Sequence, residues 1–275
     1  MMTELVVISG KGGTGKTSLV ASFAVLAGQA VVADCDVDAA DLHLVLPPTP
    51  MELHPFRSGH RAVIRQADCL GCGICQDECR FDAIEMTRSE AGEVIFTIDP
   101  VYCEGCGGCV RFCPNGAIDF PENHCGEWMV SSTRCGPMVH ARLGIAAENS
   151  GKLVSTVRRE ARRVAQEKGL AMIIVDGPPG IGCPVIASLT GASKALIVTE
   201  PTVSGEHDMR RVLELTQQFD IPAAVCVNKW DINPAMTARI ELNACRSGAS
   251  IAGRVRYDPA VTAAQMEQLA VVENG

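Results

Sequence analysis

The stretch SGKGGTGKTS, Ser9–Ser18, determines how the rest of this 275-residue sequence is interpreted. An apolar segment, residues 4–9, precedes it and predicts a buried strand, whereas residues 16–27 after it predict a helix. Between them, one run satisfies the pattern G-x-x-x-x-G-K-[ST]: Gly10, Lys11, Gly12, Gly13, Thr14, Gly15, Lys16 and Thr17. Glycines in this context let backbone N–H groups converge on phosphate at the start of a helix. The stretch therefore predicts a phosphate-binding loop, with Lys16 on the β- and γ-phosphates and the Thr17 hydroxyl on Mg²⁺.

The sequence beyond the loop predicts a parallel sheet with an insertion. Three later segments, residues 171–177, 194–200 and 223–229, are apolar and end in polar residues. Helical patterns between them predict a doubly wound, mostly parallel α/β sheet. From about residue 47 to residue 121 the pattern changes to prolines, polar residues and cysteines. We therefore expect a discontinuous domain, residues 1–58 and 121–275, and an inserted α+β domain, residues 59–120.

Composition excludes several classes of protein. Hydrophobic residues make up 47% of the chain, enough for one large α/β domain and a small one. The net charge of −8 argues against a nucleic-acid partner. No apolar run approaches the ~20 residues that span a bilayer, and no basic region precedes the first strand. We expect a cytoplasmic protein that does not contact membranes, in which the 14 cysteines serve mainly as metal ligands.

Eight of the cysteines form two runs with the spacing C-x₂-C-x₂-C-x₃-C, and Pro114 completes the bacterial ferredoxin signature after the second run. In that signature the first three cysteines of a run hold one [4Fe–4S] cluster and the fourth ligates the other cluster. The pattern thus predicts two ligand sets: Cys69, Cys72, Cys75 and Cys113 for one cluster, and Cys103, Cys106, Cys109 and Cys79 for the second. Two structural zinc sites are the alternative, but such sites normally use two C-x₂-C pairs separated by a longer loop.

A second lysine in the loop, Lys11, makes the segment KGGTGKT similar to the deviant Walker A motif of the MinD, ParA and nitrogenase iron-protein superfamily. In that superfamily the extra lysine contacts phosphate across an ATP-bound homodimer. Asp34 and Asp36 in ADCDVD match the acidic pair of switch I, and Asp176 in IIVDGPPG matches the Walker B aspartate. The resemblance implies that Asp34 and Asp176 help Thr17 to hold Mg²⁺. It also implies catalytic roles for Lys11, for Lys16, and for Asp36, which would orient the attacking water.

The segment VNKWD, from Asn228 to Asp231 in its polar part, matches the position at which this superfamily recognises the nucleotide base. The pattern N-K-x-D is also the one with which GTPases recognise guanine, and spacing alone leaves both bases open. The resemblance favours adenine, with Asn228 and Asp231 near the base. The acidic C-terminal segment MEQLAVVENG differs from MinD because it has no basic amphipathic tail, so membrane cycling is not implied.

Taken together, these motifs resemble the MinD-superfamily ATPases that carry an inserted two-cluster ferredoxin domain. The resemblance implies ATP or ADP, Mg²⁺ and two [4Fe–4S] clusters as cofactors, slow ATP hydrolysis, and a homodimer that forms on ATP binding. One interpretation is that nucleotide state gates electron transfer from the clusters to a redox partner. The other is a maturation factor that assembles or carries iron–sulfur or metal cofactors for an acceptor protein. A plain electron carrier with a vestigial nucleotide site is disfavoured by the full set of switch residues.

Cys183 lies seven residues after Asp176 (183 − 176 = 7) and just beyond a glycine-rich turn. One reading is a small apolar residue that packs the next helix. In the nitrogenase iron protein, however, a ligand of the intersubunit cluster occupies a similar place. Two copies of Cys183 could therefore share a metal or cluster across a dimer, with Cys125 or Cys135, in loops after the ferredoxin segment, completing four thiolates.

Overall fold

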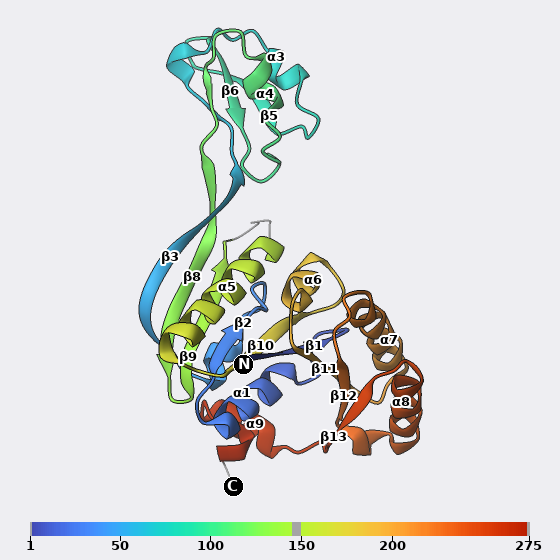
Figure 1. Ribbon diagram of the computed structural model, residues 1–275. Helices are drawn as coiled ribbons and strands as arrows, with labels where there is room; N and C mark the ends of the chain where they lie inside the picture. The colour runs from blue at the N-terminus through green and yellow to red at the C-terminus, as the bar shows by residue number, and fades with distance from the viewer. Residues whose placement is uncertain (1, 145–149, 274–275) are drawn as a thin grey trace. The chain divides into compact units, whose positions relative to one another are not determined.

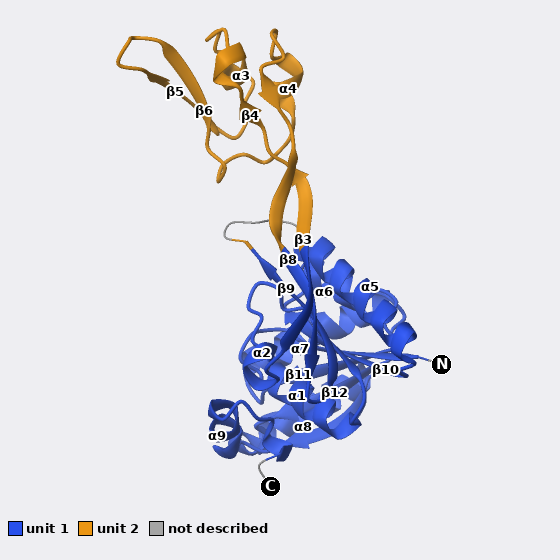
Figure 2. Ribbon diagram, turned by 90° about the vertical axis from the view of Figure 1, so that its left-hand side faces the viewer, with its two compact units in different colours: residues 1–54, 127–143, 148–275 blue, residues 55–126, 144–147 orange. Residues whose placement is uncertain are grey.

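The computed structural model describes residues 2–144 and 150–273. The chain divides into two compact units (Figure 2). The larger unit contains Met1–His54, Glu127–Leu143 and the C-terminal part of the chain, and the main segment of the smaller unit is Pro55–Gly126. That segment includes residues 59–120. In the described residues, no helix is both long enough and apolar enough to cross a membrane.

A large, mostly parallel sheet forms the centre of the α/β fold (Figure 1). Within the described residues its strands follow the order β13-β12-β11-β1-β10-β2-β9-β8-β3. The pairs from β13 through to β9 are parallel. The strands, in chain order, are β1 (Thr3–Ser9), β2 (Val31–Asp34), β3 (Thr49–His60), β8 (Glu122–Thr133), β9 (Gly136–Leu143), β10 (Met172–Pro179), β11 (Lys194–Thr199), β12 (Ala223–Asn228) and β13 (Ser250–Val255).

Helices cover both faces of this sheet because its central strands are apolar on both sides. Ile173, Ile174 and Val175 of β10 are all fully buried, although neighbouring residues of a strand point to opposite faces. Ile174 packs in one cluster with Val20 and Ala24. The helices of the larger unit are α1 (Lys16–Ala27), α2 (Leu42–Val45), α5 (Ser150–Lys168), α6 (Cys183–Leu189), α7 (Val203–Gln218), α8 (Pro234–Arg246) and α9 (Ala260–Met266), with 3₁₀ turns η2 (Trp230–Ile232) and η3 (Val271–Glu273).

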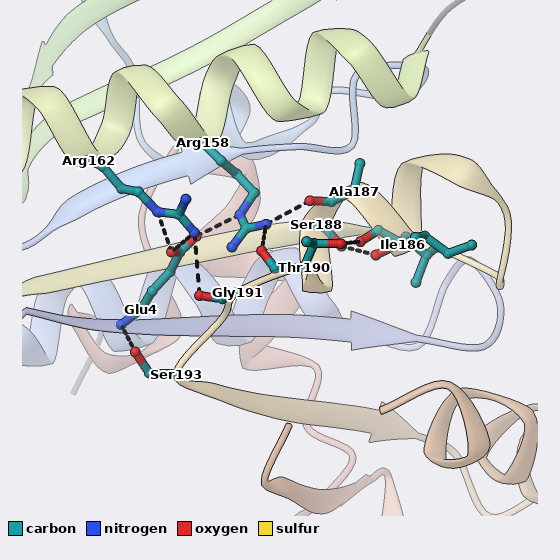
Figure 3. A network of polar contacts seen from close by, with 10 residues as sticks. Glu4, Arg158, Arg162, Ile186, Ala187, Ser188, Thr190, Gly191 and Ser193 are labelled. Atoms are coloured by element: carbon teal, nitrogen blue, oxygen red, sulfur yellow. Dashed lines mark hydrogen bonds and ion pairs between the residues drawn. The ribbon is translucent and has the colours of Figure 1, made fainter. Parts of the chain in front are cut away.

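A buried ion network joins β1, α5 and α6 (Figure 3). Arg158 Nε donates to Glu4 Oε1 at 2.6 Å, and Arg162 donates through Nε and Nη2 to Glu4 Oε2 at 2.8 and 2.6 Å. Arg158 Nη1 donates to the carbonyl oxygens of Ala187 and Thr190, at 2.6 and 2.8 Å. These carbonyls lie at the C-terminal end of α6, where a cation is favourable. The network therefore fixes the helix that follows Asp176 and its glycine-rich turn.

The smaller unit is built from short elements around a small core. Two antiparallel pairs form its sheets: β4 (Val63–Ile64) with β7 (Ile118–Asp119), and β5 (Ile84–Arg88) with β6 (Val94–Ile98). Its helical turns are η1 (Gln66–Asp68), α3 (Ile74–Asp77) and α4 (Gly108–Phe112). Ala62, Cys75, Ile84, Phe96 and Ile118 form the core, and five further cysteines that are partly buried pack against it: Cys69, Cys79, Cys103, Cys109 and Cys113. Such a small apolar core is typical of a unit that depends on metal ligation for stability.

The doubly wound, mostly parallel fold predicted from the sequence is confirmed, but two long strands were not predicted. β3 and β8 each span 12 residues, and they stand at one end of the sheet order. Pro50 and Pro55 lie within β3 and obscure its strand pattern. Proline has no N–H group for a central strand, yet it is tolerated at an edge, and β3 is an edge strand. Cys125, predicted in a loop, lies in β8.

Candidate functional site

The phosphate loop connects the end of β1 to the start of α1. Gly13 and Gly15 have φ values of +79° and +87°, a conformation that favours glycine. A Cβ atom at Gly15 would collide with the amide nitrogen of Asn228. Any larger residue at position 15 would therefore strain the backbone and displace Asn228. These two features fix the shape of the loop before any ligand binds.

A cavity of about 730 Å³ opens beside this loop in the larger unit. Its walls include the loop residues Gly12, Gly13, Gly15, Lys16 and Thr17, and Asp36 of the predicted switch I. Backbone N–H groups at the start of α1, together with the Lys16 ammonium, supply positive charge at this end of the cavity. The volume and the charge suit a nucleotide with its phosphates at the loop.

Lys16 and Asp36 form an ion pair at the mouth of the loop, with Lys16 Nζ 3.6 Å from Asp36 Oδ2. Lys16 is buried and Asp36 is partly buried. Burial raises the pKa of Asp36, and the Lys16 charge acts in the opposite direction. The Asp36 N–H also donates to Asp34 Oδ1 at 3.2 Å, so the two predicted switch I carboxylates lie together.

Two buried carboxylates lie side by side at the carboxyl edge of the sheet. Asp34 of β2 is the register partner of Asp176 of β10, and both are 1% exposed. Burial raises the pKa of Asp34 well above its usual value, and the neighbouring Asp176 charge raises it further. Burial likewise raises the pKa of Asp176 to about 6, although the Lys16 charge and the Thr17 hydroxyl lower it. The Oδ1 atom of Asp176 is buried without a hydrogen-bond partner.

This donor set fits Mg²⁺. Oxygen ligands from one or two carboxylates, a hydroxyl and substrate phosphates are what the ion prefers. An unpartnered, buried carboxylate oxygen is unfavourable unless a cation or a hydrogen-bond donor satisfies it. The buried hydroxyl Oγ1 of Thr14 is similarly without a partner. Asp176, Asp34 and Thr17 are therefore well suited to hold the ion directly or through water.

Asn228 supports the phosphate loop as well as lining the cavity. Its Nδ2 atom donates to the Thr14 carbonyl oxygen at 2.8 Å, and its Oδ1 atom accepts from the Lys229 N–H at 3.0 Å. One amide N–H and one oxygen lone pair remain for a base. Asp231 Oδ1 accepts the Tyr257 N–H at 2.8 Å, so this carboxylate anchors the loop after β13.

Several cavity residues were missed by sequence reasoning. Arg256, Tyr257 and Asp258 follow β13 directly and form part of the wall, and Val261 and Gln265 of α9 continue it. The available signal was positional, because loops at the carboxyl ends of parallel strands gather at ligand sites. Glu200, after β11, was also missed. Its carboxylate lies 3.4 Å from the ammonium of Lys11, which is thereby held on the β11–α7 side of the loop.

The eight ferredoxin-type cysteines line two cavities of the smaller unit. The first cavity is lined by Cys69, Cys72, Cys75 and Cys113, and the second by Cys79, Cys103, Cys106 and Cys109. Each cavity thus combines three cysteines of one run with the fourth cysteine of the other run. This is the distribution that the ferredoxin pattern predicts for cluster ligands.

The chemistry of these cavities fits an iron–sulfur cluster. Burial, with the neighbouring cysteines, raises the pKa of Cys75, and the same causes raise the pKa of Cys109 to about 11. Four thiolates around one space therefore require a cationic group to stabilise them. In the described part of the chain, no three His, Cys, Asp or Glu side chains converge as a site for a single metal ion. A cluster does not need such convergence, because each thiolate binds a different iron atom.

The three remaining cysteines of interest lie in different settings. Cys183 is exposed at the first position of α6. Cys125 is buried, and its Sγ donates to the Ser58 carbonyl oxygen at 3.1 Å. Cys135 is buried in the core of the larger unit, where burial raises its pKa. A thiol enclosed in this way is poorly placed to share a metal with a second subunit unless the core opens.

Comparisons with known proteins find relatives of the cysteine-rich segment and of the chain as a whole. Residues 68–117 match the family model of the 4Fe-4S dicluster domain. The chain is 35% identical over 237 residues to the uncharacterized protein MJ0578 of Methanocaldococcus jannaschii, covering 85% of this chain and 80% of that protein. Among solved structures it is similar to the septum site-determining protein MinD complexed with Mg-ADP from Pyrococcus horikoshii OT3, with a TM-score of 0.58, 17% identity, and coverage of 99% and 88%.

A ParA family ATPase from Chlorobium tepidum TLS is similarly related, with a TM-score of 0.54, 15% identity, and coverage of 100% of this chain and 93% of that one. At these identities the likeness shows the fold. The resemblance inferred from the sequence, a MinD/ParA-type fold that carries a ferredoxin domain, is confirmed by these matches.

Proposed function

The chain belongs to the same family as the Methanocaldococcus jannaschii protein MJ0578, and we propose that it is an ATP-hydrolysing, dimeric switch that gates electron transfer from two [4Fe–4S] clusters to a partner protein. In this proposal residues 1–58 and 121–275 form the ATPase domain, and residues 59–120 form the inserted ferredoxin domain. One observation carries the proposal: the chain combines a cavity at the phosphate loop with two cavities that are each lined by four cysteines.

The nucleotide part of the proposal follows from charge. Lys16 exchanges its contact with Asp36 for the β- and γ-phosphates, because a polyphosphate carries more negative charge than one carboxylate. Thr17, Asp34 and Asp176 hold Mg²⁺, which neutralises phosphate charge when it is bound. Asp36, released from Lys16, is then free to orient a water molecule. Lys11 contributes its charge to the nucleotide of the second subunit.

We favour ATP over GTP because similar folds belong to a MinD protein solved with Mg-ADP and to a ParA family ATPase. The Asp231 Oδ1 atom accepts the Tyr257 N–H, which leaves both bases open at this residue. A competition experiment with labelled ATP tests the assignment, since tighter binding of GTP would overturn it.

The cysteine part of the proposal supplies the electron path. Bound clusters accept and release single electrons. The two cavities draw their cysteines from both runs, so each cluster ties the first run to the second. Four protein ligands per cluster leave no position for a substrate. This arrangement supports electron transfer rather than catalysis at the clusters.

A second candidate function, assembly or transfer of a metal cofactor, is favoured by the exposure of Cys183. Its position at the start of α6, directly after the turn that follows Asp176, places a thiol where nucleotide-dependent movement is expected. In this alternative, dimerisation brings two such thiols together to bind a transferable metal group.

One anaerobic experiment separates the two functions. The reduced holoprotein is mixed with methyl viologen as artificial acceptor, or with an apo-ferredoxin, in the presence of Mg·ATP or Mg·ADP. Gated electron transfer predicts different viologen reduction rates with the two nucleotides, no such difference in Lys16→Ala, and no loss of iron. Equal rates with both nucleotides would contradict gating. Iron that moves to the apo-ferredoxin, and less of it from Cys183→Ser, would support the carrier function instead.

A further inference from the structure

Glu200, directly after β11, bridges two lysines that belong to different parts of the nucleotide site. Its Oε1 atom lies 2.5 Å from Lys229 Nζ, and its Oε2 atom lies 3.4 Å from Lys11 Nζ. One carboxylate therefore pairs with two ammonium groups, one at each oxygen atom. The side chain of Glu200 is 15% exposed, whereas those of Lys11 and Lys229 are 33% and 31% exposed.

The backbone that presents Glu200 is tightly held. The Thr202 N–H donates to the Glu200 carbonyl oxygen at 2.8 Å, and the Thr202 hydroxyl caps α7 by accepting the Gly205 N–H at 2.9 Å. A Cβ atom at Gly205 would collide with the Glu200 carbonyl oxygen, so the end of β11 and the start of α7 are in close contact. The carboxylate thus projects from a fixed point beside the phosphate loop.

Lys11 has a second contact on the same side. Its Nζ atom donates to the Ser204 hydroxyl, in the first turn of α7, at 3.4 Å. The neighbouring loop residues Gly12 and Gly13 line the nucleotide cavity, whereas Lys11 is not among the described residues that do so. The resting position of Lys11 is therefore against β11 and α7, and not in the space for the phosphates.

The ion pair between Lys11 and Glu200 is weak enough for Lys11 to exchange it for a contact with phosphate. Ion pairs that solvent reaches are weak, because water screens them and both side chains lose freedom. The Lys11–Glu200 pair is of this kind, in contrast with the buried pair of Glu4 and Arg158. Lys229 stays on the other oxygen and also reaches the Gly13 carbonyl oxygen, at 3.5 Å. Glu200 therefore keeps one partner when Lys11 leaves, which lowers the free-energy cost of releasing it.

We propose that Glu200 is a positioning residue that stores Lys11 in the resting subunit and releases it to the nucleotide of a second subunit. The inference rests on the proposed function, in which Lys11 acts across an ATP-bound dimer. Only ion-pair partners change in this step, and no covalent bond forms or breaks. Each contact between Lys11 and phosphate stabilises the dimer, but the net free energy is smaller because the contact with Glu200 is lost. The bridge therefore raises the protein concentration at which the dimer forms.

The test compares Glu200→Gln with a matched control in the holoprotein. Glutamine keeps the size of the side chain and removes its charge. Glu241→Gln is the control, because Glu241 is 16% exposed and forms a similar pair with Arg254, at 2.6 Å, without contacting either lysine. The first readout is the rate at which an amine-reactive ester acylates Lys11 in dilute, nucleotide-free protein, followed by peptide mass spectrometry. The contact with Glu200 holds the Lys11 side chain against β11 and α7, so Glu200→Gln should leave its amine freer to meet the ester and accelerate labelling of Lys11.

The second readout is dimerisation with Mg·ATP, measured by analytical ultracentrifugation over a range of protein concentrations. Glu200→Gln should lower the midpoint by about three- to ten-fold, the scale of one solvent-screened ion pair lost in each subunit. Nucleotide affinity of the monomer should stay within about two-fold, because Lys11 does not contact nucleotide in its own subunit. Glu241→Gln should change neither labelling nor the midpoint.

The outcomes distinguish this inference from the proposed function. Unchanged Lys11 labelling, or an unchanged or higher midpoint in Glu200→Gln, overturns the inference alone, provided that the wild-type protein dimerises with Mg·ATP. A changed midpoint with a large loss of nucleotide affinity also overturns it, since Glu200 would then act through Lys229 and the loop. A wild-type protein that remains monomeric with Mg·ATP overturns the proposed function and, with it, the release step.

Discussion

The ammonium group of Lys16 lies 3.6 Å from the carboxylate of Asp36, so an ion pair joins the phosphate loop to the segment predicted as switch I. Lys16 belongs to the first turn of α1, and Asp36 follows β2. Each residue keeps the other from its predicted role. While they are paired, the Lys16 ammonium is not free to bind phosphate, and the Asp36 carboxylate is not free to orient water. In the proposed function, the pair must therefore separate before ATP is hydrolysed.

Asp36→Ala should separate binding from turnover. Removal of the carboxylate frees Lys16, so Mg·ATP binds at least as tightly as in the wild type, while ATP hydrolysis falls by about 100-fold or more because the attacking water is no longer oriented. The ATP-bound dimer should accumulate.

Lys16→Ala should instead weaken Mg·ATP binding by about one to two orders of magnitude. Calorimetry and phosphate release measure both effects, and Lys168→Ala, at the exposed end of α5, is the control. Wild-type turnover in Asp36→Ala would contradict the assignment.

Cysteine pairs should reveal how the two runs share their clusters. Cys113→Ser should lower the iron content from about eight to about four atoms per chain, because one of two clusters loses a ligand. Adding Cys75→Ser, in the same cavity, should remove no further iron. Adding Cys79→Ser, in the other cavity, should remove nearly all of it. Iron and sulfide analysis after anaerobic reconstitution measures these differences, with Cys245→Ser, an exposed thiol outside both cavities, as control. If Cys113→Ser with Cys75→Ser loses both clusters, the cross-run assignment is wrong.

The sequence alone defines the local patterns of these sites, but not the contacts between distant residues. The phosphate loop and the cysteine runs are local patterns, in which spacing fixes the chemistry and, for α1, even the bounds Lys16–Ala27. The Lys11–Glu200 contact joins residues that are distant in sequence and that no spacing rule connects. The hydrogen bond from Asn228 to the Thr14 carbonyl oxygen likewise joins residues that are distant in sequence. Contacts of this kind depend on strand order, which places β1 beside β11, and on the loops at the carboxyl edge of the sheet.

The sequence did not predict β3 as a strand, and the reason is different. β3 contains two prolines and mostly exposed residues, so neither alternation nor an apolar run marks it as a strand. Its pairing is decided by its place at the end of the sheet, which only the three-dimensional structure gives. Arg256, Tyr257 and Asp258 were missed because their polar sequence is typical of any surface loop.

Glu4→Gln should destabilise the larger unit strongly. The variant leaves Arg158 buried beside a neutral partner, a change that costs about 3–5 kcal/mol. The melting temperature of the larger unit should fall by about 10 °C, as measured by differential scanning calorimetry. Glu160→Gln removes a carboxylate of α5 whose partners Arg159 and Arg163 are 68% and 38% exposed, and it should cost less than about 1 kcal/mol. Equal effects of the two variants would show that the buried network does not support the fold as described.

His140 should make the fold sensitive to mild acid. Burial, with the nearby charges of His43 and Arg142, lowers the pKa of His140 to about 4, and its Nε2 atom lies 2.8 Å from the Ser131 hydroxyl. The unfolded chain takes up a proton at this residue near pH 6.5, whereas the folded chain does not. Stability is therefore lost as pH falls below about 6.5, by about 1 kcal/mol at pH 5.5. His140→Gln should show a smaller difference in melting temperature between pH 7.5 and pH 5.5. An equal difference in both proteins would contradict the stated pKa.

The order of the strands along the chain has a consequence for how the protein is made. β1 pairs with β10 and β11, both of which come after the cysteine runs in the sequence. A ribosome therefore synthesises Cys113 before Asp176, which follows 63 residues later (176 − 113 = 63). At roughly 5–20 residues per second, synthesis of these residues takes about 3–13 s. Both cysteine runs are thus complete while the proposed nucleotide site still lacks β10 and β11. In the proposed function, cluster loading can therefore begin before the first binding of ATP.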